Sequence, residues 1–240
     1  MREQNKLQAN TRTNPLRIGA ITASPLNDYI EKNAKDEYRG KIQRARYINQ
    51  KAWQRFTGAA EAEGYTNAAM RKGTTREPVI KYLWSEISGI EIIDSDFKRH
   101  ETMPNFGASP DGVFADNPGV LVECKHFEAN NMTDMMERRE IKLRHRVQMI
   151  AQIACFWDWG ARACEYIWAN LDDEKGECIT EVEDLKDGQI QSMRFEPTEA
   201  EIKQVLDEVE ILDGEIAAKL LMIEKRSIPI HVDEHNNSPG

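Results

Sequence analysis

The chain has 240 residues, of which 40% are hydrophobic and 30% charged, as is typical of a soluble globular protein long enough to bury a full core. No stretch reaches the roughly 20 apolar residues that a membrane span needs, and the polar residues 1–14 lack the apolar segment of a secretory signal. The four cysteines form no CxxC pair, which argues against zinc, disulfide and iron–sulfur frameworks. We therefore expect a cytoplasmic protein without membrane contact, in the host cytoplasm if a phage encodes it.

Charge is unevenly distributed along the chain. Of its 41 acidic and 32 basic side chains, residues 172–240 hold 19 and 7, and residues 1–171 hold 22 and 25. The net charge of −9 therefore combines −12 in the last third with +3 in the rest. Because the first part is able to present a basic surface, the negative total does not exclude a nucleic-acid partner.

The N-terminal third predicts helices after a flexible arm, residues 1–14. Ser24 suits an N-cap and Pro25 the first helical position, so the first helix is expected to begin there. A second helix is expected over residues 41–62, which are rich in basic and aromatic side chains. Its basic run Lys41–Arg55 fits either a DNA-facing stripe or a solvated face.

The next segments predict a mixture of helices and strands. A third helix is expected after Gly73, with Pro78 in its first turn and an apolar stripe of Ile80, Leu83, Trp84 and Ile87. Strands embedded between helices indicate an α/β fold in which helices flank a mixed central β-sheet. The strand-like segments are residues 90–97, 107–114, 120–127, 165–170 and 189–195, and residues 140–158 show a helical pattern.

A long C-terminal helix is predicted over about residues 198–225. Thr198 and Glu201 form a capping box at its start. Apolar residues then recur at helical spacing, at Ile202, Val205, Val209, Leu212, Ile216 and Leu220. We expect residues 15–240 to form one domain that ends in this helix.

One short constellation carries the chemistry. Asp111 follows Ser109-Pro110 at the start of an expected hairpin, and Glu123-Cys124-Lys125 lies on the returning strand. Side chains alternate along a strand, so Glu123 and Lys125 share a face and Cys124 points into the core. Two carboxylates suit Mg²⁺, for which Mn²⁺ can substitute. Lys125 would orient an attacking water or help to deprotonate it, because the pKa of a buried lysine is readily lowered.

A solvent-facing Glu-x-Lys pair on a strand is common and usually inert. Here the pair follows a Pro-Asp-Gly turn at short range and is preceded by Val-Leu-Val. That combination favours a catalytic interpretation over a surface pair.

These residues match the PD-(D/E)xK nuclease signature, and the chain resembles the lambda-type phage exonuclease, or YqaJ-like viral recombinase, family. Five blocks carry the likeness over about residues 16–170. They are Arg17–Ser24, Gly73–Pro78, Gly107–Gly112, Glu123–Lys125, and a weaker block of His145–Gln148 followed by Gln152. The resemblance implies a restriction-endonuclease-like core.

The resemblance also implies an activity and partners. Members of this family digest one strand of linear double-stranded DNA from the 5′ end and leave a 3′ overhang for a single-strand annealing protein. Those similar to lambda exonuclease form a homotrimeric ring around the DNA. Two alternatives remain open at this point: a structure- or sequence-specific PD-(D/E)xK endonuclease, and a non-enzymatic module that holds DNA with a vestigial site.

By the same resemblance, Asp111 and Glu123 hold the metal, the Cys124 carbonyl adds a ligand, and Lys125 positions the water. Glu77 would serve a second metal or the water, although a surface ion pair is its ordinary alternative.

Further residues are implied around this centre. Gln148 would support either Lys125 or the scissile phosphate, and Met70 matches a wedge position, with simple helix packing as the alternative. The residues that match a pocket for the 5′-terminal phosphate are Arg17, Ser24 and Ser109. The second phosphate-binding residue stays open among Lys32, Lys35 and Arg39, and Thr13 stands where the family often has a tryptophan.

Overall fold

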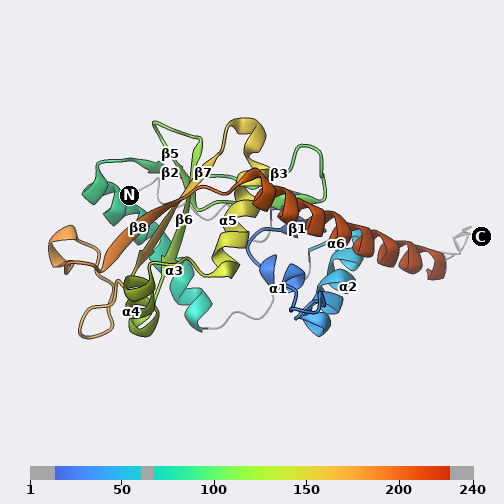
Figure 1. Ribbon diagram of the computed structural model, residues 1–240, viewed down its shortest axis with the longest axis horizontal. Coiled ribbons are helices and arrows are strands. Elements are labelled where there is room, and N and C mark those ends of the chain that lie inside the picture. The colour runs from blue at the N-terminus through green and yellow to red at the C-terminus, as the bar shows by residue number, and fades with distance from the viewer. Residues whose placement is uncertain (1–13, 61–67, 228–240) are drawn as a thin grey trace, which may run out of the picture.

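The computed structural model describes residues 14–60 and 68–227, in which two β-sheets are flanked by helices (Figure 1). The strands are β1 (Ile21–Thr22), β2 (Ile92–Ile93), β3 (Lys98–Arg99), β4 (Phe106–Ala108), β5 (Gly112–Phe114), β6 (Val120–His126), β7 (Ala163–Ala169) and β8 (Ile190–Phe195). The helices are α1 (Asn27–Ile30), α2 (Lys41–Thr57), α3 (Ala68–Ser88), α4 (Ala129–Arg138), α5 (Leu143–Cys155) and α6 (Glu199–Arg226), and short 3-10 turns cover Pro15–Arg17, Trp157–Trp159 and Val182–Asp184. The predicted α/β fold with a mixed sheet is confirmed.

The larger sheet has five strands in the order β2-β5-β6-β7-β8, and β6 lies at its centre. β5 and β6 form the antiparallel hairpin predicted from the sequence. β6 and β7 are parallel, so the chain must cross over between them, and α4 and α5 provide that connection. A smaller sheet has the order β1-β4-β3, with β1 and β4 parallel.

The two faces of β6 belong to two hydrophobic clusters. Leu121 packs in the larger cluster with α5 and α6. Val122 and Cys124 pack in the smaller cluster beneath α3. The predicted inward direction of Cys124 is therefore confirmed, and Glu123 and Lys125 lie on the α5 face.

Several predicted helix boundaries were wrong. The first helix begins at Asn27, and Ser24 makes no cap, because a turn at Ala23–Leu26 precedes the helix. α2 ends at Thr57, because Gly58 adopts the left-handed conformation with φ of 64°. Neither α4 nor β1 was predicted, since neither carries an extended apolar pattern.

α3 starts well before the position predicted for it. Gly73 lies within the helix and Pro78 is an interior residue rather than part of the first turn. Asp172 provides the physical reason: Lys72 and Arg76, in the turns before Pro78, both pair with its carboxylate, at 2.5 and 3.0 Å. Tertiary contacts thus outweigh the local breakers. Ile87 is half exposed, so the apolar stripe of this helix ends at Trp84.

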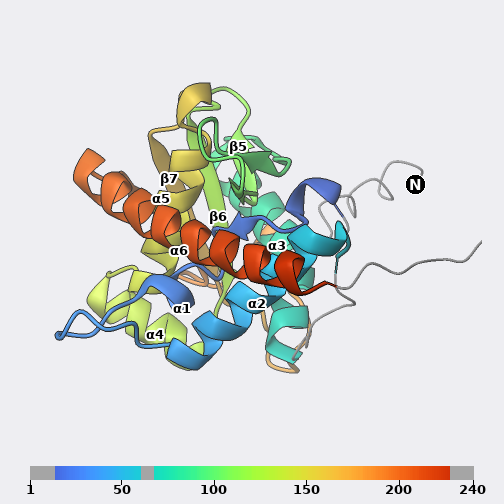
Figure 2. The same cartoon turned by 90° about the vertical axis from the view of Figure 1, so that its right-hand side faces the viewer.

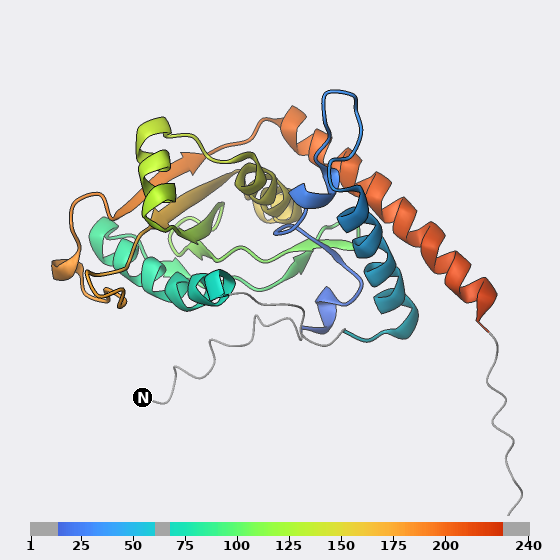
Figure 3. The same ribbon diagram turned by 90° about the horizontal axis from the view of Figure 1, so that it is seen from below.

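α6 begins with the predicted capping box, in which the Thr198 hydroxyl accepts from the Glu201 amide at 3.2 Å and the Glu201 carboxylate accepts from the Thr198 amide at 2.8 Å. The helix runs past α5 and then along α2 (Figure 2 and Figure 3). The residues of its predicted stripe from Ile202 to Ile216 are buried. None of the described helices is long and apolar enough to cross a bilayer.

Ion pairs between α2 and α6 explain part of the basic run Lys41–Arg55. Arg44 pairs with Glu215 at 2.9 Å, and Arg55 pairs with Asp213 at 2.6 Å. These two arginines therefore anchor the acidic C-terminal helix, rather than facing DNA or solvent.

His145 on α5 generates a prediction about acid stability. Its ring stacks on Phe127 and shares a hydrogen bond of 2.6 Å with the Tyr166 hydroxyl. Burial, followed by nearby cations, lowers the pKa of His145 to about 3. An unfolded histidine has a pKa of about 6.5, so between these values the unfolded chain binds the extra proton and stability falls as the pH falls.

We expect this group to remove up to about 1.4 kcal/mol of unfolding free energy per pH unit between pH 6 and pH 4. Urea denaturation of the wild type and of His145→Gln over pH 7–4 checks this, because carboxylates contribute equally to both proteins. Equal slopes would show that His145 is not held neutral.

Candidate active site

Glu123 and Lys125 lie on the same face of β6, as predicted. The Glu123 side chain is buried, and the Lys125 ammonium donates directly to its Oε1. A buried carboxylate is costly unless it is paired and hydrogen-bonded. The lysine therefore supplies the counter-charge that this position needs.

Two glutamines of α5 complete the hydrogen bonding of Glu123. Gln148 Nε2 donates to Oε1 at 2.7 Å, and Gln152 Nε2 donates to Oε2 at 2.6 Å. Gln148 thus bonds Glu123 rather than Lys125. Gln152 was quoted in the family resemblance but given no role; its spacing of four residues from Gln148, which puts both on one helix face, was the available signal.

Asp111 is joined to β6 at the end of the hairpin ladder. Its amide donates to the Val122 carbonyl at 3.0 Å, and its Oδ2 accepts from the Cys124 amide at 2.7 Å. The next position must be a glycine. A Cβ at Gly112 would come within 2.6 Å of the Ile92 side chain on the neighbouring strand. These contacts hold the Asp111 carboxylate against β6, where the charge of Glu123 acts on it.

Three carboxylates influence one another at this centre. Burial, then the charges of Glu123 and Glu77, raise the pKa of Asp111 well above its usual value. Burial and the charge of Glu123 also raise the pKa of the Glu77 carboxyl, although Lys81 opposes the rise. Lys81 lies 3.7 Å from Glu77 and was not anticipated. The signal was a Glu–Lys pair four residues apart on a helix.

The sequence-based expectation for the pKa of Lys125 was wrong. Burial alone would lower it, but the Glu123 and Asp111 carboxylates more than offset that effect and raise it. In this arrangement Lys125 is a cation held between acids.

The donor set fits Mg²⁺. Within the described residues, no three His, Cys, Asp or Glu side chains gather closely enough to hold an ion by themselves. Mg²⁺ is usually bound by one or two carboxylates together with waters and substrate phosphate. The Asp111 and Glu123 carboxylates with the Cys124 carbonyl offer only hard oxygen ligands, while the Cys124 side chain lies in the core on the other face.

The predicted phosphate-binding residues lie around the smaller sheet. The parallel register pairs Thr22 with Gly107. Ser24 lies in the turn that precedes α1, and Ser109 directly follows β4. The Arg17 guanidinium lies over the Phe97 ring at 4.9 Å, and that ring packs against Gly107. Ser24 is exposed and Ser109 half-buried. The two serines therefore follow the paired strands β1 and β4, and Arg17 lies over a ring that packs against β4.

Other candidates are placed less favourably or not described. Lys32 pairs with Glu208 at 2.6 Å, and Arg39 pairs with Glu31 at 3.2 Å. Met70 belongs to α3, but its side chain lies outside the described residues, as do Thr13 and the rest of the predicted arm up to residue 13.

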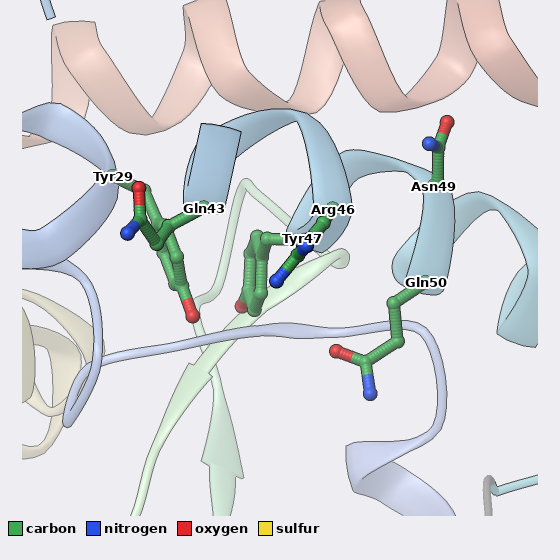
Figure 4. Close-up of a pocket in the computed structure, with 6 residues that line it drawn as sticks. All are labelled: Tyr29, Gln43, Arg46, Tyr47, Asn49 and Gln50. Carbon is green, nitrogen blue, oxygen red and sulfur yellow. The ribbon is translucent and has the colours of Figure 1, made fainter. Parts of the chain in front are cut away.

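A groove of about 560 Å³ lies between α1 and α2, close to β1 (Figure 4). Tyr29 and Tyr47 stack with ring centroids 4.0 Å apart, and the Tyr47 hydroxyl accepts from the Thr22 amide at 3.3 Å. The groove thus adjoins the strand that leads to Ser24. Its lining residues are Tyr29, Gln43, Arg46, Tyr47, Asn49 and Gln50.

A mixed sheet whose central hairpin carries Asp111, Glu123 and Lys125 defines the PD-(D/E)xK class of nuclease folds. The chain belongs to the family of the YqaJ-like viral recombinase domain, whose sequence profile matches residues 14–158. No curated protein matches the chain.

Solved proteins with similar structures include two exonucleases. The alkaline exonuclease LHK-Exo of Laribacter hongkongensis has 26% sequence identity and a TM-score of 0.69, over 87% of this chain and 93% of that one. LHK-Exo has also been solved in complex with dAMP, with the same identity and TM-score. A phage-related exonuclease of Haemophilus somnus 129PT has 15% identity and a TM-score of 0.61, over 87% of this chain and 96% of that one, which supports the fold alone.

The hydrogen bonds of Glu123 generate a stability prediction. Gln152→Leu leaves Oε2 of a buried carboxylate without its donor, so the free energy of unfolding should fall by about 1–3 kcal/mol. The matched control is Gln204→Leu on the exposed face of α6, which should stay within about 0.5 kcal/mol of wild type. Chemical denaturation measures both, and equal values for the two variants would show that Glu123 does not depend on Gln152.

Proposed function

We propose that the chain is a Mg²⁺-dependent 5′→3′ exonuclease that degrades one strand of linear double-stranded DNA and leaves a 3′ single-stranded overhang. The observation that carries this proposal is the convergence of Asp111, Glu123 and Lys125 beside the β5–β6 hairpin. Membership of the viral recombinase family and the likeness to LHK-Exo support it.

In this proposal Asp111, Glu123 and the Cys124 carbonyl hold Mg²⁺, or Mn²⁺ in its place. The ion when bound would polarise the scissile phosphate and lower the pKa of a water molecule. Gln148 and Gln152 hold the Glu123 carboxylate from behind, so it keeps one orientation through the reaction.

Lys125 acts as a fixed positive charge. An ammonium beside the carboxylates stabilises the negative charge that develops on a phosphate under attack, and its N–H groups orient the attacking water. Glu77, half-buried on α3, faces the same centre and would accept a hydrogen bond from that water or help to hold a second ion.

The direction of digestion follows from a pocket for a terminal phosphate. Arg17 offers a forked, charged donor and Ser24 and Ser109 offer hydroxyl donors, which suit a terminal phosphate with no preceding nucleotide. Such a pocket would select a 5′-phosphorylated end and hold it after each cut. The complex of LHK-Exo with dAMP supports a deoxynucleoside monophosphate product.

The proposed partners are a duplex DNA end, a single-strand annealing protein that receives the overhang, and two further copies of the chain in a homotrimer. Sedimentation of the pure protein tests the trimer.

The first experiment uses a linear duplex labelled separately at each 5′ and 3′ end, with Mg²⁺. The wild type should release the 5′ label first. Asp111→Asn and Lys125→Met should lower the rate by about 10²–10³-fold, because the first removes a charged metal ligand and the second removes the positive charge beside the reacting phosphate. The matched control is Asp116→Asn, which removes an exposed carboxylate of the β5–β6 turn. This variant should cut DNA at the wild-type rate.

Release of the 3′ label first would overturn the proposed direction. Cutting of a covalently closed circle would instead favour an endonuclease, since a circle offers no end.

A second prediction concerns Arg17. Arg17→Ala should slow digestion of 5′-phosphorylated ends by about 10–100-fold, which corresponds to the free energy of one charge-assisted hydrogen bond. The rate on 5′-hydroxyl ends should stay nearly unchanged. Arg194→Ala, which removes an exposed arginine of β8, is the control. Equal slowing of both kinds of end would mean that Arg17 does not bind the terminal phosphate.

A further inference from the structure

Lys81 connects three separate segments at the edge of the candidate site. It lies on α3 one turn after Glu77, and its side chain is only 12% exposed. The ammonium donates to the Asp94 carboxylate at 2.6 Å and to the main-chain carbonyl of Asp111 at 2.8 Å. It also lies 3.7 Å from the Glu77 carboxylate. These contacts direct the charge of Lys81 toward protein acceptors.

The contact with Asp111 fixes that residue from both ends. Its amide donates to Val122 of β6 and its carbonyl accepts from Lys81. With both backbone groups held, the direction of the Asp111 side chain is set, and its carboxylate meets the Cys124 amide at 2.7 Å. Lys81 therefore acts on the carboxylate through the backbone, without touching it.

An ordinary helix-surface ion pair does not account for Lys81. Such pairs are solvent-exposed and join residues one turn apart. The Lys203–Asp207 pair of α6 is of that kind, because the lysine side chain is 75% exposed. Lys81 is mostly buried and bonds to a residue 30 positions away.

The two lysines of the site face different acids. Lys125 donates to Glu123 on the α5 side of β6. Lys81 approaches from α3 and serves Glu77 and the Asp111 backbone. Together, the two ammonium groups offset the negative charge of three neighbouring carboxylates that repel one another.

We propose that Lys81 is a positioning residue, which holds Asp111 and Glu77 in one shared orientation so that they can receive a divalent cation. The inference rests on the proposed function for the identity of the site, but it concerns cation binding rather than DNA cleavage. Groups that orient the ligands of a metal typically change its affinity or the activity by about 10–100-fold when they are removed.

The experiment measures Mn²⁺ binding to the full chain without DNA, by calorimetry, and in parallel the single-turnover cleavage rate and the duplex Kd in Ca²⁺. Lys81→Met should weaken Mn²⁺ binding by about 10-fold or more and slow cleavage, while the duplex Kd stays near the wild-type value. Lys81→Arg, which keeps the charge and the donors, should recover much of the affinity. The control Lys203→Met removes an exposed ion pair of α6 and should change none of the three measurements.

Wild-type Mn²⁺ affinity in folded Lys81→Met would overturn the inference. So would a Lys81→Arg variant that binds Mn²⁺ no more tightly than Lys81→Met. If Lys81→Met does not fold, the polar Lys81→Gln decides, because its uncharged side chain is one atom shorter and cannot bond the Asp111 carbonyl and approach Glu77 as the ammonium does: weakened Mn²⁺ binding supports the inference and unchanged binding overturns it. A wild type that binds Mn²⁺ but cuts no DNA would contradict the exonuclease proposal and leave the role of Lys81 standing.

Discussion

The buried carboxylate of Glu123 is the constraint on which the rest of the structure depends. Placing such a group in the interior costs several kcal/mol unless charge and hydrogen bonds compensate it. The compensation comes from Lys125 on the same strand and from two glutamines of α5. α5 must therefore lie close against β6, and α6 packs with α5 in the larger hydrophobic cluster, where Glu201 also pairs with Arg146 at 2.7 Å.

The uneven charge of the sequence helps to hold α2 and α6 together. The acidic C-terminal helix does not simply face solvent, because Arg44 and Arg55 of α2 pair with its Glu215 and Asp213. These pairs use part of the basic excess of the first 171 residues to attach α6. Meanwhile the candidate site concentrates carboxylates. Burial, and after it the charges of Glu123 and Glu77, raise the pKa of Asp111, and a bound divalent cation relieves repulsion of that kind.

The sequence predicted what short-range geometry determines and missed what tertiary contacts determine. The β5–β6 hairpin, the shared face of Glu123 and Lys125 and the capping box of α6 follow from local rules, and all three are present. The start of α3 does not, because Asp172 stabilises the helix from a loop about 100 residues away. The role of Lys81 was not predicted for the same reason: its main partner, the Asp111 carbonyl, comes within reach only when α3 packs on the sheet.

The proposed phosphate pocket and metal site lie on different sheets, yet the chain links them through one residue. Ser109 directly follows β4, Asp111 directly precedes β5, and Pro110 alone separates them. Two residues of extended chain span about 7 Å, and the rigid ring of proline limits any change in that spacing. In the proposed function, this fixed step sets how far the terminal phosphate lies from the bond that is cut. A distance fixed by the backbone, rather than by flexible side chains, would make each cut remove the same length of DNA whatever its base sequence.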